Sequence, residues 1–170
     1  MGGERMRADH ALMAEVGFYH LTRSSLEQAL PRLLKRTLAA SQRALVMTSN
    51  DAERDVLNEA LWQQPEWLPH GIEADGDADL QPIWLASQLQ GREQAETPEQ
   101  EQAPNGARFL FLTYGASSDR LDRFERVFDL FDGTNEAAVQ AARGRWSAAR
   151  SGGHTVAYWQ QTDKGWQQKA

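Results

Sequence analysis

The segment Thr134–Gly152, TNEAAVQAARGRWSAARSG, carries the side chains best suited to chemistry with a ligand. In a helix, at about 100° per residue, Val139, Arg143, Trp146 and Arg150 recur at spacings of four, three and four and collect on one side. A guanidinium group can clamp a carboxylate through two parallel hydrogen bonds, and an indole packs against another ring. The pairing therefore favours binding of an acidic, aromatic peptide end.

The other side of the same predicted helix consists of small residues. They are Ala137, Ala138, Ala141, Ala142, Ala148 and Ala149. An all-alanine side would let the helix lie close to a sheet, with the arginines and the indole facing water. A second interpretation stays open at this point, namely a solvated helix face whose arginines pair with nearby acids. The lack of carboxylates on that face after Glu136 favours a binding site.

Other patterns that could support catalysis are absent or incomplete. The first strand-to-helix turn, HLTRSS, has no glycine to approach a pyrophosphate, and the chain has no P-loop. The acidic run 73–79 resembles a calcium loop, but Leu80 follows Asp79 where glycine is needed, and Ala86 stands in place of the glutamate. A solvated acidic loop is therefore the prediction. The sequence predicts no cofactor-binding site and no metal site.

Histidine and serine patterns point the same way. The histidines are His10, His20, His70 and His154, and none forms an HxH or HExxH pair. No serine lies in a GxSxG elbow, and Ser117 and Ser118 are better explained as helix caps. The sequence therefore predicts no catalytic residues. An enzyme remains as the alternative, a metal-dependent nucleotide hydrolase or a nuclease-like α/β protein.

Composition limits the class of protein. The chain has 170 residues, 41% of them hydrophobic, no cysteine and a formal net charge of −6. This suits one domain without disulfides, and the acidic balance disfavours direct contact with DNA or RNA. No apolar run is long enough to span a membrane, and the start of the chain lacks the apolar core of a signal peptide. Residues 1–15 are predicted to be a flexible tail, and the compartment to be the cytoplasm.

Hydrophobic periodicity predicts alternating strands and helices over residues 16–170. The predicted strands are Val16–Leu21, Arg43–Thr48, Pro82–Ala86, a central Arg108–Tyr114 and Thr155–Gln160, and the predicted helices are 24–40, Asp51–Trp62, 117–131 and the alanine-rich helix. Pro31 must bend the first helix or mark its first turn. The pattern indicates a single α/β domain with a doubly wound, mostly parallel central sheet and helices on both faces. Residues 87–106, rich in Gln and Glu, are predicted to be a mobile loop.

Two aromatic groups could serve either the core or a binding surface. Leu121, Phe124 and Phe128 recur at helical spacing as predicted core, and Phe131 at the end of that helix is placed to reach the surface. Trp62 and Trp67 flank QQPE at a helix end. Two tryptophans beside prolines indicate a partly exposed aromatic edge suited to a partner.

Several segments together resemble a known family. RALVMTSNDAERDVLNEALWQQPEWLPHG, ERVFDLFDG and AARGRWSAARSGGHTVAYWQQ are similar, in order and spacing, to the chi subunit of bacterial DNA polymerase III, a part of the clamp-loader assembly. The resemblance extends over most of the chain from Val16 onward. It implies a non-catalytic adaptor in DNA replication that works at replication forks of the nucleoid. The implied partners are the psi subunit and the acidic C-terminal tail of single-stranded DNA-binding protein, with DNA contacted only indirectly.

The resemblance also implies which residues hold that tail. The matching positions are Arg143, Trp146, Phe131 and Trp62, with Arg150 as a further basic position. A lysine of the family one turn before the key arginine is Val139 here, so the basic patch has one charge fewer. A third reading, a direct binder of single strands, predicts affinity for a bare oligonucleotide with a steep salt dependence.

Overall fold

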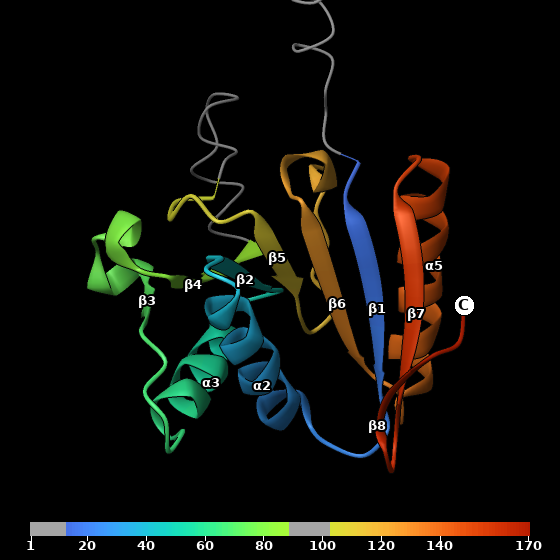
Figure 1. The fold of residues 1–170 in the computed structure, drawn as a ribbon, viewed down its shortest axis with the longest axis horizontal. Coiled ribbons are helices and arrows are strands. Elements are labelled where there is room, and N and C mark those ends of the chain that lie inside the picture. The colour runs from blue at the N-terminus through green and yellow to red at the C-terminus, as the bar shows by residue number, and fades with distance from the viewer. Residues whose placement is uncertain (1–12, 89–102) are drawn as a thin grey trace, which may run out of the picture.

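The computed structural model describes residues 13–88 and 103–170, which form an eight-stranded sheet with helices on both faces (Figure 1). The strand order is β3-β4-β2-β5-β6-β1-β7-β8, and neighbouring strands are parallel except β7 and β8. The strands are β1 (Glu15–Leu21), β2 (Ala44–Thr48), β3 (His70–Ile72), β4 (Ile83–Ser87), β5 (Phe109–Leu112), β6 (Arg126–Asp132), β7 (Thr155–Thr162) and β8 (Gly165–Gln168). The helices are α2 (Leu26–Ala39), α3 (Asp51–Trp62) and α5 (Glu136–Ser151), with 3₁₀ turns at Glu73–Asp75, Ala78–Leu80 and Leu121–Arg123. The predicted doubly wound, mostly parallel α/β class is confirmed.

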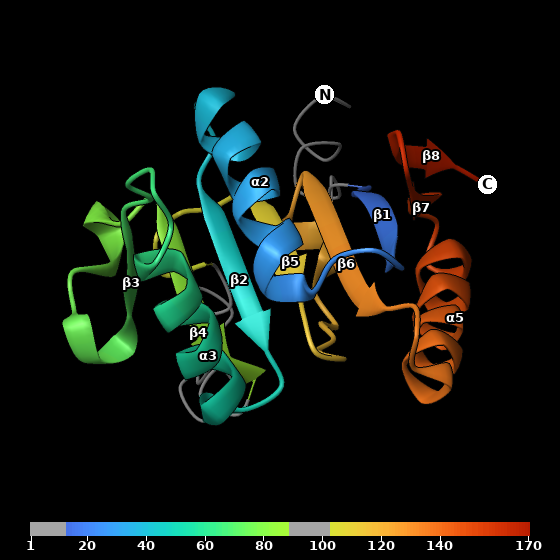
Figure 2. The same ribbon diagram turned by 90° about the horizontal axis from the view of Figure 1, so that it is seen from below.

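The sheet separates two layers of helix. Helices α2 and α3 pack together on one face, and α5 lies on the other (Figure 2). One apolar cluster, which includes Leu30, Leu34 and Phe111, lies under α2 and α3, and a second, which includes Phe18 and Ala142, lies under α5. All four residues of β5 are buried in the middle of the sheet, as a continuous apolar run predicts.

Local hydrogen bonds fix where the first two helices begin. The side chain of Gln28 accepts from the backbone N–H of Ser25 at 3.1 Å, and that of Asn50 accepts from the N–H of Glu53 at 2.9 Å. Helix α2 begins at Leu26, so Pro31 lies in the helix interior and not in its first turn. At that position its missing N–H removes one backbone hydrogen bond.

The predicted helix over 117–131 is wrong. The structure has a 3₁₀ turn at Leu121–Arg123 followed by strand β6. Phe128 and Phe131 are an odd number of residues apart, so in a strand they point to opposite faces, and each is buried in a different apolar cluster. A strand covered on both faces is apolar at consecutive positions, which imitates helical spacing. Phe131 is only 4% exposed and does not reach the surface as predicted.

The last strand is longer than predicted, and a further strand follows it. Strand β7 runs to Thr162 and turns at Asp163 and Lys164 into the antiparallel strand β8. The polar ending of the chain conceals this hairpin, but Gly165 has a φ of 111°, a conformation that favours glycine. The hairpin adds Trp166 to the sheet.

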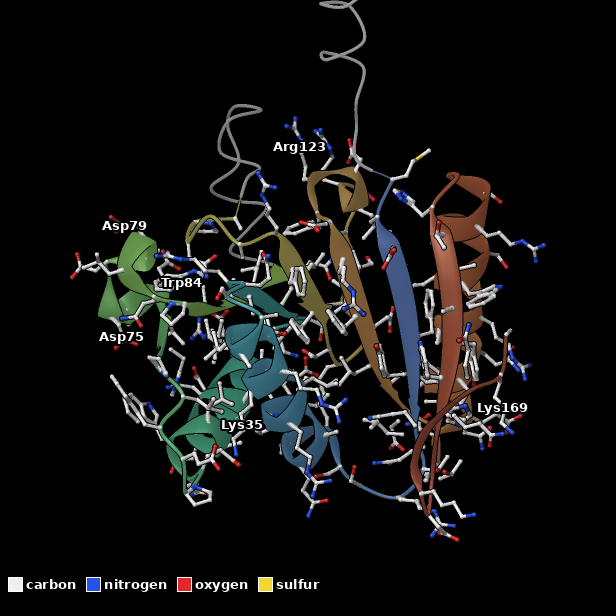
Figure 3. All side chains as sticks on the ribbon, in the orientation of Figure 1. Lys35, Asp75, Asp79, Trp84, Arg123 and Lys169 are labelled. Atoms are coloured by element: carbon white, nitrogen blue, oxygen red, sulfur yellow. The ribbon has the colours of Figure 1, made fainter. Side chains whose placement is uncertain are left out.

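The acidic run 73–79 lies at the β3 edge of the sheet. It forms two short 3₁₀ turns whose residues are not buried, and Asp75 and Asp79 lie at the opposite margin of the molecule from Lys169 (Figure 3). Asp75 accepts a hydrogen bond from the N–H of Ile72 at 3.0 Å.

Most of the predicted tail at 1–15 and of the predicted loop at 87–106 lies outside the described residues. Within the described part, Ala14 is fully buried. Asn105 is also buried, and its side chain donates to the carbonyl oxygens of Ala44 at 3.0 Å and Gln81 at 3.1 Å.

Candidate functional site

Helix α5 places the predicted binding residues over strands β6, β1 and β7. Asn135 begins the helix by accepting from the N–H of Ala138 at 3.1 Å. The predicted division into an alanine side and an opposite binding side is wrong in part: Ala142 and Ala149 are buried, but Ala141 is exposed and Trp146 is half-buried. Trp146 is four residues from Ala142 and so only about 40° from it around the helix. The indole therefore packs beside the alanines.

A pocket of about 420 Å³ opens between α5, the middle of strand β7 and Ala170. We call it the Trp146 pocket. Its lining consists of Phe18, Phe131, Val139, Ala142, Arg143, Trp146, Tyr158 and Ala170. The Trp146 ring meets Phe18 edge-on at 5.4 Å between centroids and Tyr158 at 6.1 Å, and Phe131 lies behind Tyr158 at 6.2 Å. The walls are thus aromatic, and the one charged side chain among the lining residues is that of Arg143.

Three of the five predicted residues line this pocket. Phe131, Arg143 and Trp146 lie together, as the resemblance implies. Arg150 is exposed two helical turns beyond Arg143, or about 10 Å along the axis, so it flanks the pocket without lining it. Trp62 lies at the end of α3, a helix that packs on β4 at the far side of the sheet, and is not part of the pocket.

The sequence reasoning missed two aromatic walls and their support. Phe18 and Tyr158 are register partners on β1 and β7, so they face the same side of the sheet. The Tyr158 hydroxyl is hydrogen-bonded to Nδ1 of His20 on the next strand. Burial raises the pKa of Tyr158, and the nearby charge of Arg143 partly opposes that rise. The alternation of Val16, Phe18 and His20 along the first strand was the available signal.

A buried ion pair anchors the same helix beside the pocket. Nε of Arg145 lies 2.6 Å from one oxygen of Asp129, and Nη2 lies 3.0 Å from the other. Asp129 sits on β6 and is 1% exposed. Burial raises the pKa of Asp129, and the hydrogen bonds and charge of Arg145 lower it against that effect. The pair fixes the rotation of α5 over the sheet, and thereby the direction in which Arg143 and Trp146 point.

A second, larger cleft of about 820 Å³ lies at the carboxyl ends of β1 and β6, where ligands of doubly wound sheets bind. It is lined by Glu27, Glu53 and Asp132 among others. Each carboxylate is engaged locally: Glu27 accepts from the Tyr114 hydroxyl, Glu53 from Ser49, and Asp132 from Thr134. The hydrogen bonds from Thr134 lower the pKa of Asp132. Across residues 13–88 and 103–170, no three or more His, Asp or Glu side chains are grouped to hold a metal.

No helix within the described ranges is long and apolar enough to cross a membrane. The described helices instead pack on the two faces of the sheet.

Comparisons with known proteins point to one family. The family described as DNA polymerase III chi subunit, HolC, matches residues 13–157, which include strands β1 to β6 and the first three residues of β7. A curated relative, "Probable DNA polymerase III subunit chi" of Rickettsia prowazekii (strain Madrid E), is 25% identical over 80 residues, or 46% of this chain. The chain spans about half the length of that relative, 48%. On the family match, the chain belongs to the DNA polymerase III chi subunit family.

Proposed function

We propose that this chi subunit is a non-catalytic adaptor, which links the clamp loader to single-stranded DNA-binding protein during DNA replication. It binds the psi subunit on one surface and the acidic C-terminal tail of single-stranded DNA-binding protein on another. It acts in the cytoplasm, at replication forks, and touches DNA only indirectly. The acidic chain, with a net charge of −6, is consistent with indirect contact, since nucleic-acid backbones are bound by basic surfaces.

The Trp146 pocket is the observation that carries the tail-binding part of the proposal. A terminal phenylalanine ring packs in the pocket against the Trp146 and Tyr158 rings, where edge-to-face contact is available. The exposed guanidinium of Arg143 at the same pocket binds the terminal carboxylate. Arg150, farther along the helix, attracts the preceding aspartates. Val139, half-buried in the pocket wall, offers apolar contact in place of a charge.

Replacing Arg143 is expected to weaken tail binding about tenfold, as loss of an interface arginine commonly does. Calorimetric titration of a tail peptide against wild type and Arg143→Ala measures the change. Affinity should also fall as salt rises, because the contact is charged and exposed. Arg32→Ala, which removes an exposed arginine from α2 on the other face, is the matched control. Equal affinity of the Arg143→Ala protein and wild type would show that the tail binds elsewhere.

The surface that we assign to psi runs from the end of α3 to the start of β3. Trp62 is 57% exposed and Trp67 is 77% exposed. Exposed tryptophan rings of this kind are commonly covered by a protein partner. The Trp62 ring is held against His70 at 4.5 Å between centroids, so it is presented in a fixed position. This surface and the Trp146 pocket lie on opposite faces and toward opposite edges of the sheet, which allows both partners to bind together.

Changing Trp67 to alanine should reduce psi binding about tenfold or more without loss of stability, because the side chain is mostly exposed. Co-purification and calorimetry with psi measure the effect, and a thermal melt checks the fold. Leu80→Ala, which removes another exposed apolar side chain, is the control. If Trp67→Ala and Leu80→Ala bind psi equally well, this assignment is wrong.

A further inference from the structure

Half of the sheet face opposite α5 carries no helix within the described ranges. In Figure 1, α2 and α3 lie in front of the left part of the sheet, and no helix lies in front of strands β6, β1 and β7. Side chains on this face include Tyr19, Phe128, Trp159 and Trp166. Trp159 and Trp166 are partly exposed, whereas Tyr19 and Phe128 beneath them are buried. Partly exposed aromatic side chains of this kind are common where another molecule packs.

Tyr19 forms the floor of this surface because Gly17, two residues before it on β1, has no side chain to occupy the same space. A Cβ atom at Gly17 would lie 2.8 Å from Cε2 of Tyr19, so the ring rests across the backbone of its own strand. Trp166 of the β7–β8 hairpin meets the Tyr19 ring edge-on at 5.1 Å between centroids. Trp159 lies nearly parallel to it, at 6.4 Å and 9°. The hairpin therefore raises an aromatic wall beside a flat aromatic floor.

These rings enclose a pocket of about 300 Å³, which we call the Tyr19 pocket. Its lining consists of Tyr19, Leu33, Arg36, Thr37, Ala40, Phe109, Arg126, Phe128, Trp159 and Trp166. Arg126 lies over the Phe128 ring, with Cζ 4.8 Å from the ring centroid. Arg36 is exposed on α2. Burial raises the pKa of Tyr19, and the charges of Arg126 and Arg36 partly oppose that rise. Both guanidinium groups therefore lie close enough to influence the same hydroxyl group.

The charge of the pocket is unbalanced. Two arginines and no carboxylate are among the lining residues. Within the described ranges, the acid nearest to Arg126 is Glu15 on the adjacent strand, at 3.9 Å and with 72% of its side chain exposed, which is a weak contact. No ion pair of Arg36 occurs among the described residues. A negatively charged ligand could therefore pair with Arg36 and Arg126, which no carboxylate of the pocket lining neutralises.

We propose that the Tyr19 pocket is a second peptide-binding site, which takes an acidic internal segment of a protein partner carrying one aromatic side chain. The aromatic side chain packs against Tyr19, Trp159 and Trp166, and flanking carboxylates pair with Arg36 and Arg126. A nucleic acid fits less well, because a strand needs a basic groove that follows its backbone, and here two cations flank a small pocket on an acidic protein. The site is independent of the proposed tail-binding function, because it lies on the other face of the sheet.

Part of this site lies beyond the residues that match the family. The family match ends at residue 157, and both Trp159 and Trp166 follow it. The part of the chain that matches the family supplies Tyr19, Arg36 and Arg126, and the residues beyond it supply the wall.

The test uses the full-length protein and an acidic peptide with one internal tryptophan, Asp-Asp-Asp-Trp-Asp-Asp, amidated so that it has no terminal carboxylate. Fluorescence anisotropy measures binding to wild type and to Arg36→Glu. The charge reversal should weaken binding about tenfold. Arg32→Glu, one turn earlier on the same exposed part of α2, is the matched control and should retain wild-type affinity. Proton–nitrogen NMR of the chain's indole groups should show shifts confined to Trp159 and Trp166.

The alternatives give different results. Absence of peptide binding at millimolar concentration overturns the proposal, as does equal weakening by the Arg36 and Arg32 reversals. Loss of binding in Arg143→Ala would place the peptide in the Trp146 pocket and also overturn it. Binding of oligothymidylate with shifts at Trp159 and Trp166, without binding of the peptide, would replace the peptide by a nucleic acid.

Discussion

Arg145→Ala should unfold far more easily than wild type at neutral pH. The substitution leaves Asp129, which is 1% exposed, without the guanidinium that satisfies both of its oxygens. Removing one partner of a buried pair is strongly destabilising, by about 3–5 kcal/mol, because the remaining charge has no compensation. Urea denaturation followed by circular dichroism measures the loss. Arg150→Ala, on the exposed last turn of the same helix, should change stability little.

The loss in Arg145→Ala should also depend on pH. Burial raises the pKa of Asp129 in the folded protein, and Arg145 opposes that rise. Without Arg145 the folded-state pKa rises further above the unfolded value, so the folded variant takes up a proton more readily than the unfolded chain. A raised carboxyl pKa contributes stability at low pH that is lost as pH rises through the folded-state pKa. The difference in the free energy of unfolding between wild type and Arg145→Ala should therefore be smaller at about pH 5 than at about pH 7.5.

Two outcomes would contradict this account of the ion pair. One is an equal stability gap at both pH values, which would mean that lost packing and not the buried charge explains the effect. The other concerns the double variant Asp129→Asn, Arg145→Ala, which removes the charge together with its partner. It should recover part of the stability lost in Arg145→Ala. A double variant less stable than Arg145→Ala would be inconsistent with an unpaired carboxylate.

Gly133→Ala should be the most damaging addition of a single methyl group among the described glycines. A Cβ there would lie 1.9 Å from Cδ2 of His20 and 2.6 Å from the carbonyl oxygen of Leu21. That carbonyl accepts from the N–H of Gly133 at 2.7 Å, so the backbones cannot separate without losing a hydrogen bond. Overpacking of this kind destabilises by about 1–3 kcal/mol, and Gly133→Ala should lie at the upper end.

A helical glycine provides the matched control for Gly133→Ala. A Cβ at Gly144 would have no atom within 4 Å, and the residue lies within α5. Gly144→Ala should therefore stabilise the protein by up to about 1 kcal/mol. Urea denaturation should show a lower free energy of unfolding for Gly133→Ala than for wild type, and a higher one for Gly144→Ala. Because His20 supports Tyr158 through a hydrogen bond, Gly133→Ala should also weaken tail binding at the Trp146 pocket. A Gly133→Ala protein as stable as wild type would rule out the predicted clash.

Much of the fold could be predicted because the local signals were strong. The continuous apolar runs of β2 and β5 match buried parallel strands, and α3 has the predicted bounds, Asp51–Trp62, with Asn50 as its cap. Strand β6 was missed because its apolar residues are buried on both faces, which removes the alternation that identifies a strand. The hairpin was missed because β8 is short and half-polar, and its pairing with β7 is a tertiary contact.

The candidate site was only partly predictable for a related reason. Arg143 and Trp146 lie one turn apart on a helix, so spacing alone brings them together. Phe18 and Tyr158 come from strands far apart in the chain, and only the sheet register makes them neighbours. Arg145 resembles any arginine of a solvated helix until its buried partner, Asp129, is located. Trp62 is a tryptophan like Trp146, but it lies far from the pocket. That separation follows from the strand order, which the sequence does not state.

The hairpin that closes the sheet also bears on self-association. An outermost strand presents unpaired N–H and C=O groups on which a second molecule can add a strand. Here β8, which has four residues, two of them glutamine, pairs with Trp159–Thr162, the second half of β7. The opposite edge is β3, with three residues. Both outermost strands of the described sheet are thus short, so they offer little template for edge-to-edge aggregation at high protein concentration.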